Sequence, residues 1–269
     1  MKLNHYELDP KDRFVTANGI NIYYRDQGIG QPLILLHGGT DTHRLWNPYL
    51  PIFLEYFRVI TPDSRGHGRT MSLSGELSYR MMADDLAALI RVLELNHPLI
   101  FGYSDGGQAV LDFGMRYPGF AKALIIGGSW YRFSKEYQDA LRNAGFVGPG
   151  EINYQVFEKN APPDWIERMR HSHPHPDPDY PRTLLETLAS LWWTPLDYRA
   201  EDFQNITEPT LIMIGELDEM IPFAEAREMA KMIPRAELAV IPGAAHNDVL
   251  IENGLFLNLV LDFLKTQSD

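Results

Sequence analysis

The stretch Gly102-Tyr103-Ser104-Asp105-Gly106 decides how this 269-residue chain is expected to fold, because it matches the G-x-S-x-G pattern. It lies between an apolar run at 98–103, predicted as a strand, and a helical stretch at about 105–116. A sharp turn at this junction would lift the serine hydroxyl clear of both elements, and the two glycines would let them approach without Cβ clashes. The positive end of the helix would stabilise an anion beside the serine. The pattern therefore predicts that Ser104 is a nucleophile.

A serine hydroxyl is an effective nucleophile at neutral pH only when a base accepts its proton. Of the nine histidines, His246 is the best placed, because it follows the last predicted strand in a loop of small residues. Asp218 follows the preceding strand, and the carboxyl ends of parallel strands meet at one edge of a sheet. We therefore expect His246 to exchange the proton of Ser104 and Asp218 to orient the imidazole. Glu216 and Glu219 are alternatives for the acid.

An attacked carbonyl becomes an oxyanion, which needs hydrogen-bond donors already in place. We expect one donor to be the backbone N–H of Asp105, the residue after the nucleophile. The other is expected from the loop His37-Gly38-Gly39-Thr40, whose backbone carries little side-chain obstruction. The N–H of Gly39 is favoured, with Thr40 next, and the His37 imidazole is interpreted as a brace for this loop.

Short apolar segments alternate with helical patterns along most of the chain, which predicts a mostly parallel central sheet with helices on both faces. An opening hairpin is expected to turn at Asn18-Gly19 and to add antiparallel strands at one edge. Strands are predicted at 14–17, 20–24, 33–36, 58–61, 98–103, 123–126, 210–214 and 237–241, and helices at 78–95, 105–116, 223–233 and 249–265.

The alternation breaks after Gly128 and resumes with the strand predicted at 210–214. From roughly residue 131 to residue 197 the sequence has helical patterns, many aromatic residues and no segment typical of a buried strand. The strands on either side are typical of one sheet, so we predict an α/β core from residues 1–130 and 198–269 with a helical cap at 131–197. Trp130 and Trp192 are expected to contact substrate, together with Tyr103 and Thr40.

Three histidines, His171, His173 and His175, alternate with other residues in a proline-rich part of the predicted cap. A metal site is one interpretation of this run. Asp177 and Asp179 in the same run could join such a site. Metal-binding histidines, however, usually need further hydrogen-bonding partners that fix their rings. We favour an exposed loop and expect no metal.

The composition excludes several classes of function. Lys and Arg number 24 against 36 Asp and Glu, and the net charge of −12 would repel phosphate backbones and anionic lipids. Neither nucleic acid nor a membrane is therefore an expected partner. The absence of cysteine removes thiol catalysis and cysteine-bound zinc, and residues 1–10 lack the apolar segment of a secretion signal. We expect a cytoplasmic monomer or homodimer that acts on a small-molecule ester.

Five motifs stand in the order found in the α/β-hydrolase-fold serine hydrolases, and the chain resembles that family over nearly its whole length. The motifs are His37-Gly38, residues 63–68, residues 102–106, residues 215–218 and His246. The resemblance implies a cofactor-free esterase-type enzyme that cleaves carboxylic esters through an acyl-enzyme intermediate. Serine at position 104 argues against the dehalogenase and epoxide-hydrolase branches, which use a carboxylate nucleophile.

Asp105 is a less ordinary residue at its position. The stretch from Gly102 to Gly107 resembles the elbow of the valacyclovir-hydrolase (biphenyl-hydrolase-like) group, which cleaves esters of α-amino acids. In that group the corresponding carboxylate is associated with the substrate ammonium, and a carboxylate here could attract a cationic acyl group. The alternative is that Asp105 only complements the positive end of its own helix.

Other functions use the same Ser-His-Asp set. Carbon–carbon bond hydrolases of this fold do so, although the loop at 37–40 lacks their longer run of glycines. Lactone opening and perhydrolysis would need no different residues. A receptor with slow or no turnover is a further alternative from a different class.

Overall fold

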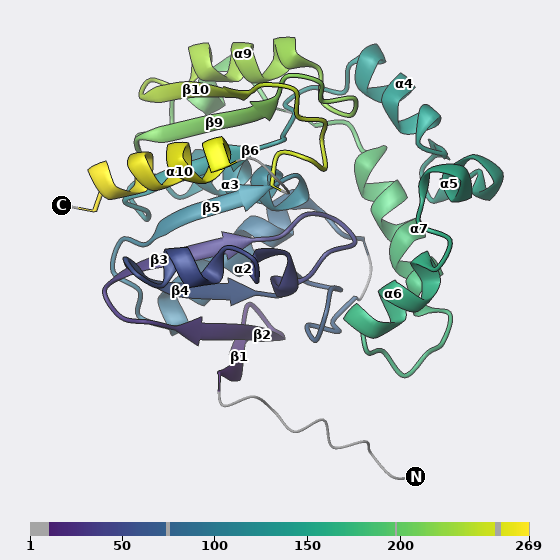
Figure 1. Cartoon of the computed structure of the whole chain (residues 1–269), viewed down its shortest axis with the longest axis horizontal. Helices are drawn as coiled ribbons and strands as arrows, with labels where there is room; N and C mark the ends of the chain where they lie inside the picture. The colour runs from purple at the N-terminus through teal and green to yellow at the C-terminus, as the bar shows by residue number, and fades with distance from the viewer. Residues whose placement is uncertain (1–10, 74–75, 197, 251–253, 269) are drawn as a thin grey trace.

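A computed structural model describes residues 11–73, 76–196, 198–250 and 254–268. Within them, eight strands form one sheet in the order β1-β2-β4-β3-β5-β6-β9-β10 (Figure 1). The pairs β1–β2 and β2–β4 are antiparallel, and the other neighbouring strands are parallel. These pairings confirm the predicted fold class. The strands of this sheet are β1 (Asp12–Ala17), β2 (Ile20–Gln27), β3 (Gln31–Leu36), β4 (Phe57–Pro62), β5 (Leu99–Tyr103), β6 (Ala123–Gly127), β9 (Thr210–Gly215) and β10 (Ala236–Ile241).

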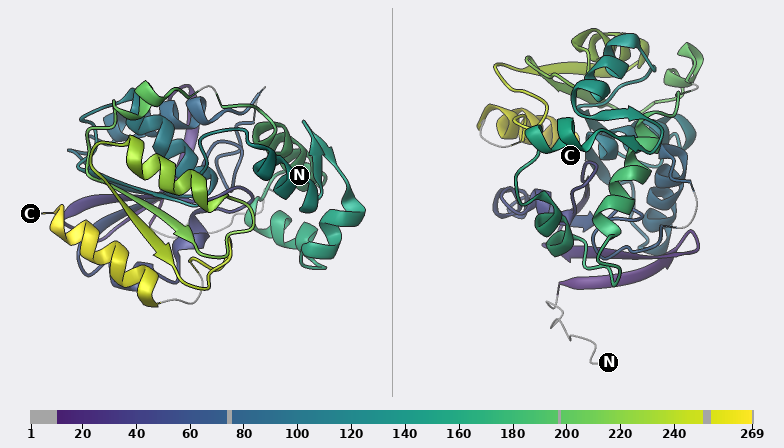
Figure 2. Two further views of the ribbon diagram at one scale, coloured as in Figure 1. Left: turned by 90° about the horizontal axis from the view of Figure 1, so that it is seen from above. Right: turned by 90° about the vertical axis from the view of Figure 1, so that its right-hand side faces the viewer.

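Helices cover both faces of the sheet. They are η1 (His43–Trp46), α1 (Leu50–Phe53), α2 (Tyr79–Val92), α3 (Asp105–Arg116), α8 (Ala200–Phe203), α9 (Phe223–Met232) and α10 (Gly254–Thr266). Figures 1 and 2 show α9 and α10 on opposite faces. In β3, Leu33 and Leu35 pack in the layer that contains α1 and α10, whereas Ile34 and Leu36 pack with α2 and α3. Burial on both faces explains why the central parallel strands β5 and β6 are continuous apolar runs.

The local sequence signals for the hairpin and for α2 are confirmed. Asn18 and Gly19 have φ angles of 47° and 74°, as a type I′ turn requires. Ser78 precedes α2, and its hydroxyl accepts a hydrogen bond from the backbone N–H of Met81.

The inserted segment contains α4 (Lys135–Asn143), α5 (Tyr154–Asn160), α6 (Trp165–Ser172) and α7 (Tyr180–Trp192). These helices lie beyond the carboxyl ends of the parallel strands (Figure 1). The segment also contains a two-stranded sheet, β7 (Phe146–Gly148) and β8 (Glu151–Ile152), in which Phe146 is buried. The expectation of no buried strand was therefore wrong, because a three-residue strand is too short to give a periodic signal. β6 pairs directly with β9, so the strands before and after the insertion belong to one sheet.

Some sequence predictions fall outside the described residues. These are the absence of a secretion signal at 1–10, the end of the cap at residue 197 and part of the predicted helix at 249–265. Among the residues that are described, no helix has the length and apolar character needed to cross a membrane.

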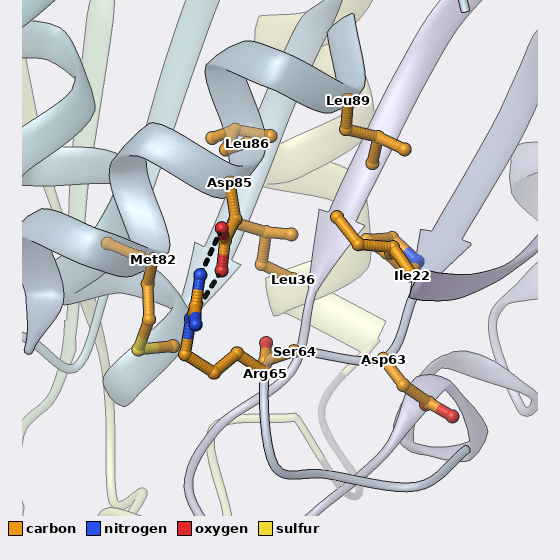
Figure 3. A pocket seen from close by; sticks show the side chains of 11 residues that line it. Ile22, Leu36, Asp63, Ser64, Arg65, Met82, Asp85, Leu86 and Leu89 are labelled. Atoms are coloured by element: carbon orange, nitrogen blue, oxygen red, sulfur yellow. Dashed lines mark hydrogen bonds and ion pairs between the residues drawn. The ribbon is translucent and has the colours of Figure 1, made fainter. Parts of the chain in front are cut away.

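The turn at residues 63–68 is fixed by an ion pair with α2. The guanidinium of Arg65 donates to both carboxylate oxygens of Asp85 at 2.6 and 2.8 Å, and both side chains are buried (Figure 3). Asp63 points away from this pair and accepts hydrogen bonds from the backbone and the ring of His43. The cavity beside Arg65 measures about 30 Å³, enough for roughly one water molecule, so we interpret it as a packing feature.

Three buried histidines form a contact between the core and the insertion. The ring centroids of His37 and His67 are 5.1 Å apart, and those of His67 and His173 are 5.8 Å apart. His173 is only 1% exposed and follows α6, which includes His171. The expectation of an exposed loop was therefore wrong for His173, because α6 extends into the run and turns this residue towards the core. His171 is exposed as expected, but it belongs to α6 rather than to a loop. The described residues contain no group of three or more His, Cys, Asp or Glu side chains that could hold a metal.

We predict that this contact makes stability depend on pH. Burial lowers the pKa of His37 to about 4, and it also lowers the pKa values of His67 and His173. Since the unfolded chain then binds more protons, stability from these groups is complete above about pH 6.5 and is lost as the pH falls. Between pH 7.5 and 5, the free energy of unfolding measured by urea denaturation should fall less in His173→Gln than in the parent. His171→Gln, at an exposed site, should follow the parent; equal pH dependence in all three proteins would contradict the prediction.

Candidate active site

Ser104 lies in a strained turn between β5 and α3. Its φ and ψ angles are 54° and −121°, a conformation that non-glycine residues rarely adopt. A Cβ added to Gly102 would lie 2.2 Å from the carbonyl oxygen of Gly106. A Cβ on Gly106 would lie 2.6 Å from the carbonyl oxygens of both Leu36 and His37. The close approach expected from the two glycines is therefore confirmed, and it extends to the end of β3.

The structure brings Ser104, His246 and Asp218 together in one line of hydrogen bonds. The Nε2 atom of His246 is 3.1 Å from the Oγ of Ser104, and its Nδ1 is 2.8 Å from an oxygen of Asp218. The other oxygen of Asp218 accepts from the backbone N–H groups of Met220 and Ile221. Because an ionised carboxylate only accepts, Nδ1 carries the proton and Nε2 presents its lone pair to the serine hydroxyl.

The two alternative acids occupy other positions. Glu216 accepts a hydrogen bond from the N–H of Gly243. Glu219 accepts from the backbone N–H of His246, and the hydroxyl of Tyr103 donates to the carbonyl oxygen of the same residue. Glu219 and Tyr103 therefore fix the main chain of His246 rather than its ring, and Glu216 fixes the main chain of Gly243.

The surroundings of His246 favour its protonated form. Burial by itself lowers the pKa of the imidazole, but the hydrogen bond and the charge of Asp218 outweigh burial and raise the pKa above its usual value. The ring can therefore hold a proton during a reaction.

The expected oxyanion donors lie beside the serine. Gly38 is so close to Ser104 that an added Cβ would come within 3.1 Å of the serine Cβ. Thr40 has a φ of 63°, and a hydrogen bond from the N–H of Asp41 to the carbonyl of Gly38 closes a turn around Gly39. Asp105 is the first residue of α3, so its N–H has no acceptor within the helix. Both amides belong to backbone that is held in place before any substrate binds.

The carboxylate of Asp105 is buried beside this loop. It accepts a hydrogen bond from the hydroxyl of Tyr79 at 2.7 Å, and both of its oxygens lie 3.0 Å from the indole nitrogen of Trp192. A Cβ on Gly39 would lie 2.4 Å from one of these oxygens. Burial raises the pKa of Asp105, and the two hydrogen bonds offset only part of this effect. The side chain bonds to α2 and α7, which goes beyond complementing the end of its own helix.

The other predicted substrate contacts differ in their placement. Tyr103 is 4% exposed and its hydroxyl is committed to His246. Trp130 is 3% exposed, stacked on Tyr137 with ring centroids 4.6 Å apart. Thr40 and Trp192 are only partly buried. Tyr79 was missed by the sequence analysis, because an apolar position of an amphipathic helix carries no local sign that its hydroxyl reaches a neighbouring element.

A family model described as the alpha/beta hydrolase family matches residues 33–257. The chain is 27% identical over 268 residues to a 2-hydroxy-6-oxo-2,4-heptadienoate hydrolase of Pseudomonas putida, covering 95% of this chain and 96% of that protein. It is 26% identical to a 2-(acetamidomethylene)succinate hydrolase of Mesorhizobium japonicum, covering 94% of each. A thermophilic esterase from Thermogutta terrifontis has a similar fold, with a TM-score of 0.74 at 24% identity over 96% of this chain and 99% of that one.

We predict that the imidazole of His246 titrates above pH 6.5 and that Asp218 is the cause. In Asp218→Asn, burial would lower the pKa of the imidazole without the opposing charge of Asp218. The titration midpoint of His246 should therefore fall below pH 6.5. Histidine titration followed by NMR measures both values directly. Glu219→Gln removes a more remote charge and should move the midpoint less. A midpoint that Asp218→Asn leaves unchanged would show that another group sets the pKa.

Proposed function

Because the chain belongs to the alpha/beta hydrolase family, we propose that it is a serine hydrolase that cleaves carboxylic esters through an acyl-enzyme on Ser104. The observation that carries this proposal is the line of hydrogen bonds from Asp218 through His246 to the serine hydroxyl, at 2.8 and 3.1 Å. A base in this tautomer, next to a hydroxyl on a strained turn, is arranged for proton transfer.

In the acylation step, the Oγ of Ser104 attacks the ester carbonyl carbon while Nε2 of His246 takes the hydroxyl proton. The N–H groups of Gly39 and Asp105 would bind the oxyanion of the tetrahedral intermediate. When the intermediate collapses, the carbon–oxygen bond to the alcohol breaks and the imidazolium returns its proton to the departing alkoxide. Asp218 stabilises the imidazolium throughout this step.

Deacylation repeats the sequence with water. His246 removes a proton from a water molecule, whose oxygen attacks the acyl carbon. The new intermediate expels Ser104, which regains its proton from the imidazolium. The products are a carboxylic acid and an alcohol, and the protein is restored without a cofactor.

The charge of Asp105 supports a preference among esters. Its carboxylate is stabilised by a phenol and an indole, which are neutral donors, so the site keeps a net negative charge close to Gly39. Such a charge attracts a cationic acyl group and repels an anionic one. We therefore extend the proposal to a preference for esters of α-amino acids.

A carbon–carbon bond hydrolase is the second candidate. The names of two relatives, a 2-hydroxy-6-oxo-dienoate hydrolase from Pseudomonas putida and another from Metapseudomonas resinovorans, favour it. These names describe anionic substrates, and the carboxylate of Asp105 would repel such a charge. Turnover of a 2-hydroxy-6-oxo-dienoate faster than that of any ester would favour this candidate.

Purified protein should hydrolyse 4-nitrophenyl acetate, and Ser104→Ala should lower kcat/KM by about 10³-fold or more, because the covalent route is removed. Ser190→Ala on α7 is a matched control, since its hydroxyl bonds only within its own helix. The control should stay within about twofold of the parent, and both variants should keep the parental melting temperature. Unchanged turnover in Ser104→Ala would remove this residue from the mechanism.

We also predict that alanine ethyl ester is preferred over its N-acetyl form in kcat/KM, by about tenfold or more, because a buried carboxylate attracts the ammonium. In Asp105→Asn this ratio should fall towards one. Asp112→Asn replaces another buried carboxylate on α3 and should keep the parental ratio. A preference that survives in Asp105→Asn, or that is absent in the parent, would leave Asp105 without a role in selecting the acyl group.

A further inference from the structure

We propose that Trp192 limits the length of the acyl group that reaches Ser104, and that the carboxylate of Asp105 holds the indole in its limiting position. The inference rests on the ester hydrolysis proposed above. It concerns the size of the acyl group, whereas the preference already stated concerns its charge.

The indole of Trp192 lies between two loops of the core. One is the turn at residues 102–106 that carries Ser104 (the nucleophile turn), and the other is the loop at residues 37–40 (the oxyanion loop). Its nitrogen is 3.0 Å from each oxygen of Asp105. On its six-membered ring, Cζ2 lies only 2.9 Å from the position that a Cβ on Gly39 would occupy. A tryptophan at the end of α7 therefore stands directly against the backbone expected to bind the oxyanion.

The indole is held by two side chains, Asp105 and Phe146. Asp105 is 2% exposed, and the hydroxyl of Tyr79 donates to its Oδ1, so a second hydrogen bond fixes the carboxylate that Trp192 contacts. Phe146 packs edge-to-face on the indole with ring centroids 4.7 Å apart. Moving the indole away would break hydrogen bonds to a buried charge, which are stronger than those between neutral groups.

The chemistry places the acyl chain on the side of Trp192. The leaving alcohol must face His246, because the imidazolium gives it a proton. The carbonyl oxygen must face the N–H groups of Gly39 and Asp105. The remaining substituent of the tetrahedral carbon is the acyl chain, which points away from His246 and past the residues that Trp192 contacts. A rigid indole at this position discriminates strongly between acyl chains of different length, since one methylene group changes kcat/KM by roughly 10-fold or more.

Trp193 provides a matched control, because it is the next residue and has the same side chain. Its indole nitrogen donates to the carbonyl oxygen of Phe146, and its ring packs on Phe133. Both of these partners belong to the insertion, so removal of Trp193 should disturb the insertion without opening the space beside Ser104.

The test compares 4-nitrophenyl hexanoate with 4-nitrophenyl acetate, using the ratio of their kcat/KM values. The parent should favour acetate. Trp192→Ala should raise the hexanoate-to-acetate ratio by about tenfold or more, mainly through KM, whereas Trp193→Ala should keep the parental ratio. Asp105→Ala leaves the backbone N–H in place but releases the indole, so it should raise the ratio too. Because both changes remove the same barrier, the hexanoate-to-acetate ratio of the double variant should be no higher than that of Trp192→Ala.

A second measurement separates this inference from the proposed function. Methanesulfonyl and hexanesulfonyl fluoride form a sulfur–oxygen bond with a reactive serine and release fluoride, so mass spectrometry can follow their reaction at Ser104 without any ester turnover. Labelling without ester hydrolysis would refute the proposed function, while the ratio of the two labelling rates would still test the size limit. The inference would be overturned if Trp192→Ala left the ratio of the two labelling rates unchanged, or if Trp193→Ala shifted that ratio equally. Absence of labelling by either reagent would overturn it too.

Discussion

The structure depends on a close approach of three backbone segments that only glycine permits. The end of β5, the start of α3 and the end of β3 meet at Gly102 and Gly106, where any Cβ would overlap a carbonyl group. This contact holds Ser104 in its strained conformation, and it sets the oxyanion loop beside the first amide of α3. The cost of about 1–3 kcal/mol for such a residue is met by the parallel strands packed on both sides. The serine proposed as the nucleophile is therefore positioned by the core, before any substrate binds.

Two carboxylates flank the serine, and their partners give them different roles. Asp218 faces an imidazole, so its charge is used to raise the pKa of His246 and to fix its tautomer. Asp105 faces a phenol and an indole, which satisfy its oxygens without neutralising its charge. Asp218 thus acts on the imidazole of His246. The role proposed for Asp105 is to set the shape and charge of the space beside Gly39.

The insertion is tied to the core at points close to this site. Trp192 bonds to the nucleophile turn, and the hydroxyl of Tyr180 donates to the carbonyl of Gly66. His173 packs on His67 in the same turn of the core. These contacts link α6 and α7 to the loops at the carboxyl ends of the strands. The acyl side proposed for the site would consequently be bounded by residues of both segments.

The sheet, the sharp turn at Ser104 and the identity of the three aligned side chains could all be predicted from the amino-acid sequence. Apolar runs, the Asn18-Gly19 turn and the glycines around Ser104 are local signals, because each follows from the conformational limits of the chain at that point. Strand order then placed His246 and Asp218 at one edge. Only the tertiary structure decided that Tyr79 and Trp192 converge on Asp105, that His173 is buried and that Tyr103 serves His246. These contacts join residues tens of positions apart through side-chain directions, which depend on how whole elements pack and leave no periodic trace in the sequence.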